Sequence, residues 1–137
     1  MQSLSVQAVL VGGVVVAAFL VYVPFGLVAY GRLQLGMQAL ATPRAVVDKL
    51  PAYAQRATWA HQNSFEAFTL FAAACLLAYV TGITGGWVMG AVIAHLSARL
   101  LYSIFYILNV PLLRSLMFGI GSLSSATLMI SSFLKVF

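Results

Sequence analysis

Four long apolar stretches, separated by short polar or glycine-rich segments, dominate the chain. They cover about residues 4–30, 60–80, 88–110 and 112–134, and each is long enough to cross about 30 Å of hydrocarbon as a helix. Pro24 stands inside the first stretch, where a proline frees a carbonyl and kinks a helix. The most polar segment, about residues 31–55, is expected to be a loop, and Pro51 fits the first turn of the second helix. The pattern predicts an all-α integral membrane protein, a single domain over residues 1–137 built as a four-transmembrane-helix bundle.

Composition and charge agree with this prediction. Hydrophobic residues make up 63% of the chain and charged residues only 7%, whereas soluble domains have about 25% charged residues. Apart from Arg99 and Lys135, the basic residues lie in or beside the first and third loops: Arg32, Arg44, Lys49, Arg56 and Arg114. The positive-inside rule therefore predicts a cytoplasmic first loop and both termini on the non-cytoplasmic side. Membrane topology accounts for the net charge of +5, so no nucleic acid is expected as a partner.

Polar side chains form one stripe on each of two neighbouring predicted helices. The second helix carries Arg56, Asn63 and Glu66, and the third carries His95, Arg99, Tyr102 and Tyr106. If the two helices fold as an antiparallel hairpin about residues 81–86, positions whose numbers add up to about 167 lie at equal depth. The two stripes are therefore expected to meet inside the membrane.

Glu66, one of only two acidic residues in the chain, falls nearly level with Arg99 in this hairpin. A carboxylate below the lipid headgroups is costly unless a partner satisfies it, so the sequence predicts an ion pair between Glu66 and Arg99. The pair could merely hold the hairpin together. The additional polar groups near it, and the arginines toward the cytoplasmic end, instead favour a cleft for an anionic ligand, because guanidinium groups suit carboxylates.

Three motifs in register now resemble a known family, the membrane-associated proteins in eicosanoid and glutathione metabolism (MAPEG), which includes microsomal glutathione transferases, leukotriene C synthase and microsomal prostaglandin E synthase. The motifs are Arg56…Asn63-x-x-Glu66, Arg99-x-x-Tyr102-x-x-x-Tyr106 and Pro111-x-x-Arg114-Ser115. The resemblance covers nearly the whole chain, including its length and its four spans.

The resemblance implies a homotrimer in the lipid bilayer that binds glutathione between subunits, with the active site toward the cytoplasm. Carried over by motif, the residues that would hold glutathione are Asn63, Glu66, Tyr102 and Tyr106, with Arg32, Arg56 and Arg99 completing the polar cleft. Arg114 would stabilise the thiolate, with Ser115 and Tyr106 as candidates for handling protons. A neighbouring cation favours the thiolate of a thiol whose pKa is about 8.5.

Two positions depart from the family pattern. Trp59 stands where many members carry a second arginine, and Phe118 stands where one branch has a tyrosine. Both changes remove polar groups from the expected glutathione site. They leave open a different thiol cofactor or a protein without catalysis.

The sequence thus predicts a glutathione-dependent transferase or peroxidase acting on lipophilic electrophiles or lipid hydroperoxides. The alternatives are a non-catalytic glutathione-binding or scaffold protein of the same family, and a small proton-coupled exporter of lipophilic cations, which would need a free membrane acid. No metal site is expected, because neither His61 nor His95 has a second ligand at metal spacing. His95 is predicted to be a hydrogen-bonded packing residue, and His61 an interfacial polar residue.

Overall fold

The computed structural model describes residues 5–137, and this range is helical throughout its regular structure, without a strand. The helices are α1 (Val6–Tyr22), α2 (Phe25–Leu35), α3 (Met37–Ala41), the 3-10 helix η1 (Val47–Lys49), α4 (Ala52–Thr81), α5 (Gly86–Ile107) and α6 (Pro111–Val136). Four helical segments are long and apolar enough to cross a membrane: Val6–Leu35, Ala52–Thr81, Gly86–Ile107 and Pro111–Val136. The predicted all-α membrane protein with four spans is confirmed.

The helices extend beyond the apolar stretches of the sequence at the end of the bundle that carries the first loop. α2 continues past residue 30 to Leu35, so residues 31–35 are helical and not part of the expected loop. α4 begins at Ala52, directly after Pro51, as the proline predicted. The apolar pattern marks only the part of a helix that lies in hydrocarbon, so it does not detect polar turns that continue the helix. The segment between α2 and α4 contains the short helices α3 and η1. The predicted start of the first span at residue 4 lies outside the described residues.

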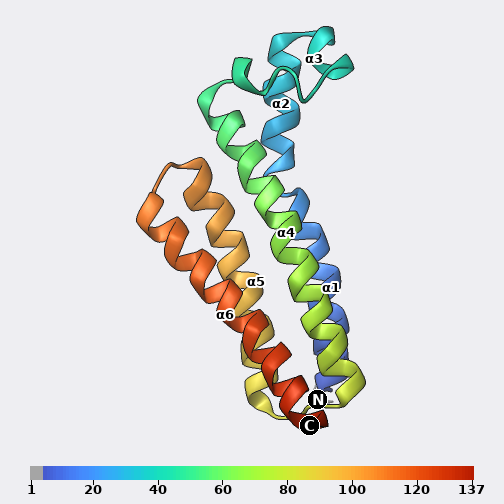
Figure 1. Cartoon of the computed structure of the whole chain (residues 1–137). Coiled ribbons are helices and arrows are strands. Elements are labelled where there is room, and N and C mark those ends of the chain that lie inside the picture. The colour runs from blue at the N-terminus through green and yellow to red at the C-terminus, as the bar shows by residue number, and fades with distance from the viewer. Residues whose placement is uncertain (1–4) are drawn as a thin grey trace.

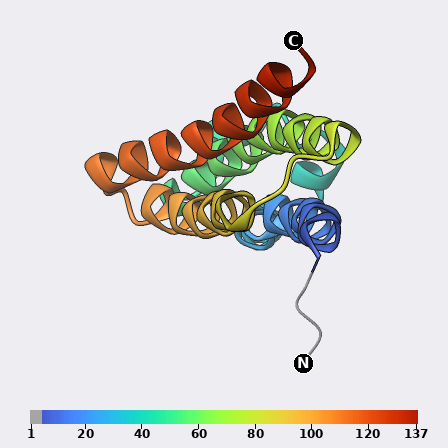
Figure 2. The same cartoon turned by 90° about the horizontal axis from the view of Figure 1, so that it is seen from below.

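α4 and α5 form the middle of the bundle, and α1 and α6 flank them on opposite sides (Figure 2). Both flanking helices pack on both central helices. α2 continues α1 along α4 after a break at Pro24, while α5 and α6 form a hairpin that diverges from α2 toward the end that carries α3 (Figure 1). Both described ends of the chain lie at the opposite end of the bundle (Figure 1).

A core of apolar side chains joins the four helices in the half of the bundle near the termini. Its largest fully buried members come from all four helices: Leu10, Phe71, Val88, Val92 and Leu128. Gly13 allows α1 to approach closely, since a Cβ there would lie 2.6 Å from a methyl group of Val92. This half is packed with hydrocarbon, so the polar residues are left to the other half.

The hairpin of α4 and α5 has nearly the predicted register. The rings of Phe71 and His95 stack at 3.8 Å between centroids, and Arg99 reaches Asn63 at 3.0 Å. The first pair agrees with the predicted depth to within one residue, and the second, which the long arginine side chain spans, differs from it by about one and a half helical turns. The two polar stripes therefore face each other, as the spacing indicated.

Candidate functional site

Arg99 is the centre of the polar contacts between α4 and α5. Its side chain is only 6% exposed, and its Nη2 donates to Oδ1 of Asn63 at 3.0 Å and to Oγ of Ser64 at 3.4 Å. The guanidinium carbon lies 4.1 Å from the centre of the Tyr102 ring. Nε is buried without a hydrogen-bond partner. The hydrogen bonds and the ring contact of this buried cation are all to neutral side chains, and the Glu66 carboxylate lies one hydrogen bond further away, beyond Asn63.

The predicted direct ion pair between Glu66 and Arg99 is wrong. Glu66 is exposed, and its Oε2 accepts a hydrogen bond from Nδ2 of Asn63 at 3.4 Å. No carboxylate lies within salt-bridge distance of a guanidinium in residues 5–137. The physical reason is the helical phase of α4: Ser64 faces the bundle, Asn63 lies at its edge, and Glu66 is turned further outward. Asn63 therefore bridges the two charges instead of letting them meet.

Aromatic rings continue the polar line from Arg99 toward the α5–α6 turn. The rings of Tyr102 and Tyr106 meet edge to face at 5.5 Å, and the guanidinium carbon of Arg114 lies 4.5 Å from the centre of the Tyr106 ring. The contact between Arg114 and Tyr106 is a cation–π interaction between two neighbouring helices. Four of the predicted site residues therefore form one continuous row: Arg99, Tyr102, Tyr106 and Arg114.

The two positions that depart from the family pattern border this row. Trp59 is exposed and lies 6.4 Å from the Tyr106 ring, and Phe118 lies 6.4 Å from the Tyr102 ring. Both place aromatic side chains next to the tyrosines. The row is therefore polar along its length and aromatic at its sides.

Arg114 and Ser115 lie in the first turns of α6, which begins at Pro111. This turn contains no acidic residue, and its backbone N–H groups give the helix start a partial positive charge. A guanidinium beside that charge is unfavourable unless an anion is present. Ser115 is exposed. The start of α6 is therefore a second position at which an anion would be stabilised.

Arg56 and Arg32, two further predicted site residues, have other contacts. Arg56 donates its Nε to the backbone carbonyl of Ile107, the last residue of α5, at 2.8 Å. Arg32 lies on α2, where its guanidinium carbon is 5.7 Å from the Phe25 ring and its Nε is buried without a partner. The contacts found in residues 5–137 do not connect Arg32 to the row formed by Arg99 and Arg114.

His95 lies about one helical turn before Arg99 on α5 and is buried in the bundle. It is 2% exposed, its Nδ1 lies 3.0 Å from the carbonyl oxygen of Gly121, and Oγ of Ser125 lies 3.2 Å from the same nitrogen. A Cβ on Gly121 would lie 3.3 Å from Cδ of Arg99, so glycine leaves the space that the arginine stem fills. The prediction that His95 is a hydrogen-bonded packing residue is confirmed. In the described part of the chain, no group of His, Cys, Asp or Glu is suited to hold a metal ion.

His61 has a structural contact that the sequence did not reveal. Its Nδ1 lies 2.7 Å from the backbone oxygen of Val21, and because a carbonyl only accepts, this nitrogen carries the proton. Val21 precedes the break between α1 and α2 at Pro24, where regular helical hydrogen bonding is interrupted. His61 is half-buried, and its contact with Val21 attaches α4 to the kinked first span.

The sequence pattern did not lead us to predict Ser64 as a partner of Arg99, although the spacing of small residues on α4 indicates that Ser64 points inward. The buried face of α4 follows small residues at helical spacing, and Ser64 lies in phase with them: Ala54, Ala57, Ala60, Ala74 and Ala78. Reading that phase would have placed Ser64 inward and Glu66 outward. The polar residues of α4 alone do not decide whether Glu66 points into the bundle or away from it.

Comparisons with known proteins identify one relationship. The family model described as MAPEG family matches residues 9–134, which is nearly the whole chain. No curated protein and no solved structure matches. The match confirms the resemblance carried by the three motifs.

Proposed function

The chain belongs to the MAPEG family, and on this basis we propose that it is a membrane-bound glutathione-dependent enzyme that transfers the thiol to a lipophilic electrophile or reduces a lipid hydroperoxide. The proposed cofactor, used as a co-substrate, is glutathione. The proposed assembly is a homotrimer, with the site toward the cytoplasm and the termini on the other side.

The observation that carries the proposal is the buried guanidinium of Arg99 without a carboxylate partner. A buried charge is costly, and its partners normally compensate it with opposite charge. Here the partners are the neutral side chains of Asn63, Ser64 and Tyr102, and Nε remains unused. A ligand with carboxylate groups would supply the missing charge, and glutathione has two.

Arg114 is the residue that we propose to stabilise the thiolate. It lies at the positive end of α6 and above the Tyr106 ring. The guanidinium charge and the helix start both favour an anion at this position, which lowers the cost of releasing the thiol proton, while the contact with the Tyr106 ring holds the guanidinium in place. The thiolate sulfur then bonds to the electrophilic carbon of the acceptor, and the displaced electron pair either leaves with a departing group or moves into a conjugated double bond that then takes up the proton. Ser115 and Tyr106 are the candidates for moving that proton. Lipophilic acceptors would enter from the bilayer around the exposed side of the row.

The proposal has a direct test in detergent-purified protein. The wild type should conjugate a generic electrophile to glutathione, and Arg114→Ala should lower that rate by roughly tenfold or more, the low end of the effect of one positioned donor. Arg44→Ala is the matched control, because Arg44 is an exposed arginine in the segment between α2 and α4. Equal rates for the wild type and Arg114→Ala would remove Arg114 from the mechanism.

The same experiment separates an enzyme from a binding protein. Wild-type protein that binds glutathione but turns over neither an electrophile nor a hydroperoxide would identify a non-catalytic family member. The departures at Trp59 and Phe118 are the feature that favours this second function, since both remove polar groups beside the tyrosines.

A further inference from the structure

Arg56 has a hydrogen bond that gives it a role different from ligand binding. Three of the last four carbonyls of α5 accept backbone N–H groups from the following turn, namely those of Ile104, Phe105 and Tyr106. The fourth belongs to Ile107 and accepts Nε of Arg56 at 2.8 Å. Such terminal carbonyls need partners from outside the helix. Arg56, from α4, therefore completes the hydrogen bonding at the end of α5.

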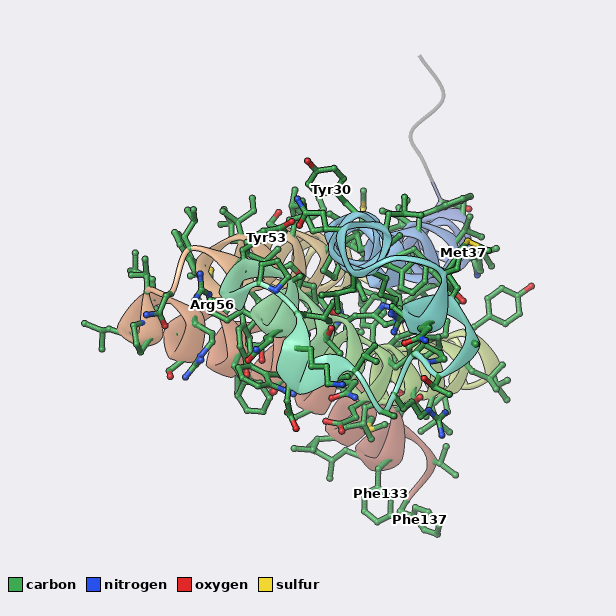
Figure 3. All side chains as sticks on the ribbon, turned by 90° about the horizontal axis from the view of Figure 1, so that it is seen from above. Tyr30, Met37, Tyr53, Arg56, Phe133 and Phe137 are labelled. Carbon is green, nitrogen blue, oxygen red and sulfur yellow. The ribbon has the colours of Figure 1, made fainter. Side chains whose placement is uncertain are left out.

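The charge of Arg56 strengthens this contact. The carbonyl end of a helix carries partial negative charge, and a nearby cation stabilises it. α5 has no basic residue of its own in its last turn. Figure 3 shows the Arg56 side chain between α4 and the neighbouring end of the α5–α6 hairpin. The contact thus joins two parts of the bundle that otherwise diverge toward this end.

The turn fixed by Arg56 leads directly to Arg114. Asn109 in this turn has a positive φ of 59°, and α6 begins at Pro111. The guanidinium of Arg114 lies against Tyr106, in the same last turn of α5 whose end Arg56 holds. A shift of this turn relative to α4 would change the position of Arg114 relative to the residues of α4, Asn63 among them.

We propose that Arg56 is a positioning residue: through its hydrogen bond to Ile107 it holds the α5–α6 turn on α4 and so sets the distance of Arg114 from the Asn63 end of the site. It acts through the turn and does not bind a carboxylate of the ligand. The consequence for catalysis rests on the proposed glutathione chemistry, whereas the effect on the turn does not.

Two substitutions separate these roles because of where they place a donor. In Arg56→Gln the amide nitrogen lies the same number of bonds from the backbone as Nε of Arg56, so the donor to Ile107 is kept while the guanidinium is lost. Arg56→Met has similar length without any donor. Arg44→Met is the control for loss of a positive charge, since Arg44 is exposed.

Hydrogen exchange of the ligand-free protein in lipid nanodiscs tests the structural half. Arg56→Met should increase the exchange rate of amides in residues 108–110 by roughly tenfold, the effect of losing a hydrogen bond to a charged group. Arg56→Gln and Arg44→Met should stay within about threefold of the wild type, less than the loss of one such bond. Unchanged exchange in Arg56→Met overturns the proposal.

Steady-state kinetics with glutathione and with its diethyl ester test the functional half. A positioning role predicts that Arg56→Met lowers kcat with both thiols to a similar extent and that Arg56→Gln restores it. A loss confined to glutathione, equal in the Gln and Met variants, overturns the proposal, because it identifies a carboxylate contact. If the wild type uses neither thiol, the proposed function fails, but the exchange experiment still decides the role of Arg56.

Discussion

Replacing Arg99 by methionine distinguishes a functional charge from a structural contact between helices. Methionine is similar in length to the stem of arginine and has no charge. The substitution removes the hydrogen bonds of the guanidinium to Asn63 and Ser64, at 3.0 and 3.4 Å, and its contact with the Tyr102 ring. It also removes a cation that is 6% exposed and has no carboxylate partner.

The magnitudes predict a small effect on stability and a large effect on binding. Hydrogen bonds to a charged group contribute about 1.5–3 kcal/mol each, and the longer one less. Relief of the desolvation cost of a buried charge is several kcal/mol in the other direction. The two effects nearly cancel, so the melting temperature should change by only a few degrees. A carboxylate ligand that loses its charged partner should bind about thirtyfold more weakly or worse.

The assay is thermal unfolding in detergent together with calorimetric titration of glutathione, for the wild type, Arg99→Met and the control Arg44→Met. The expected result is a small change in melting temperature and a large loss of affinity in Arg99→Met alone. Unchanged affinity, accompanied by a large fall in melting temperature, would refute the reasoning. Arg99 would then serve only to join α4 to α5.

Two further predictions concern packing and the kinked first span. Gly13→Ala should destabilise the protein by about 1–3 kcal/mol, because its Cβ would lie 2.6 Å from a valine methyl group of α5. The control is the neighbouring Gly12→Ala, which should be neutral or slightly stabilising because a Cβ there would have nothing within 4 Å. Equal melting temperatures of the two variants would contradict the close contact between α1 and α5. His61→Leu should cost about 1–3 kcal/mol by leaving the carbonyl of Val21 without its donor. Gln62→Leu, at an exposed position, is its control, and thermal unfolding of both variants provides the measurement.

The sequence predicted the helices and the facing of the two stripes because both follow from spacing. Apolar length identified the four spans, and equal depth in a hairpin brought the polar stripe of α4 opposite that of α5. It placed Asn63 level with Tyr102 to Tyr106, whereas in the structure Asn63 contacts Arg99. Spacing alone could not decide which side of a stripe points inward, so the direct pairing of Glu66 with Arg99 was wrong. The small buried residues of α4, not its polar ones, set that rotation.

Contacts to the backbone were the other part that the sequence did not reveal. His61 donates to the carbonyl of Val21, and Arg56 donates to that of Ile107. Both acceptors lie where helical hydrogen bonding is interrupted, one at the Pro24 kink and one at a helix end. Sequence analysis located the kink and the approximate helix end, but which distant side chain fills each vacant acceptor depends on the three-dimensional arrangement.

In the proposed function, the row from Asn63 through Arg99 and Tyr106 to Arg114 binds glutathione as a thiolate. The most direct measurement is an experimental structure of the wild type in lipid nanodiscs at saturating glutathione. The account predicts a glutathione carboxylate hydrogen-bonded to Arg99 and the sulfur beside Arg114. Glutathione bound away from this row, or no bound glutathione at saturation, would contradict it.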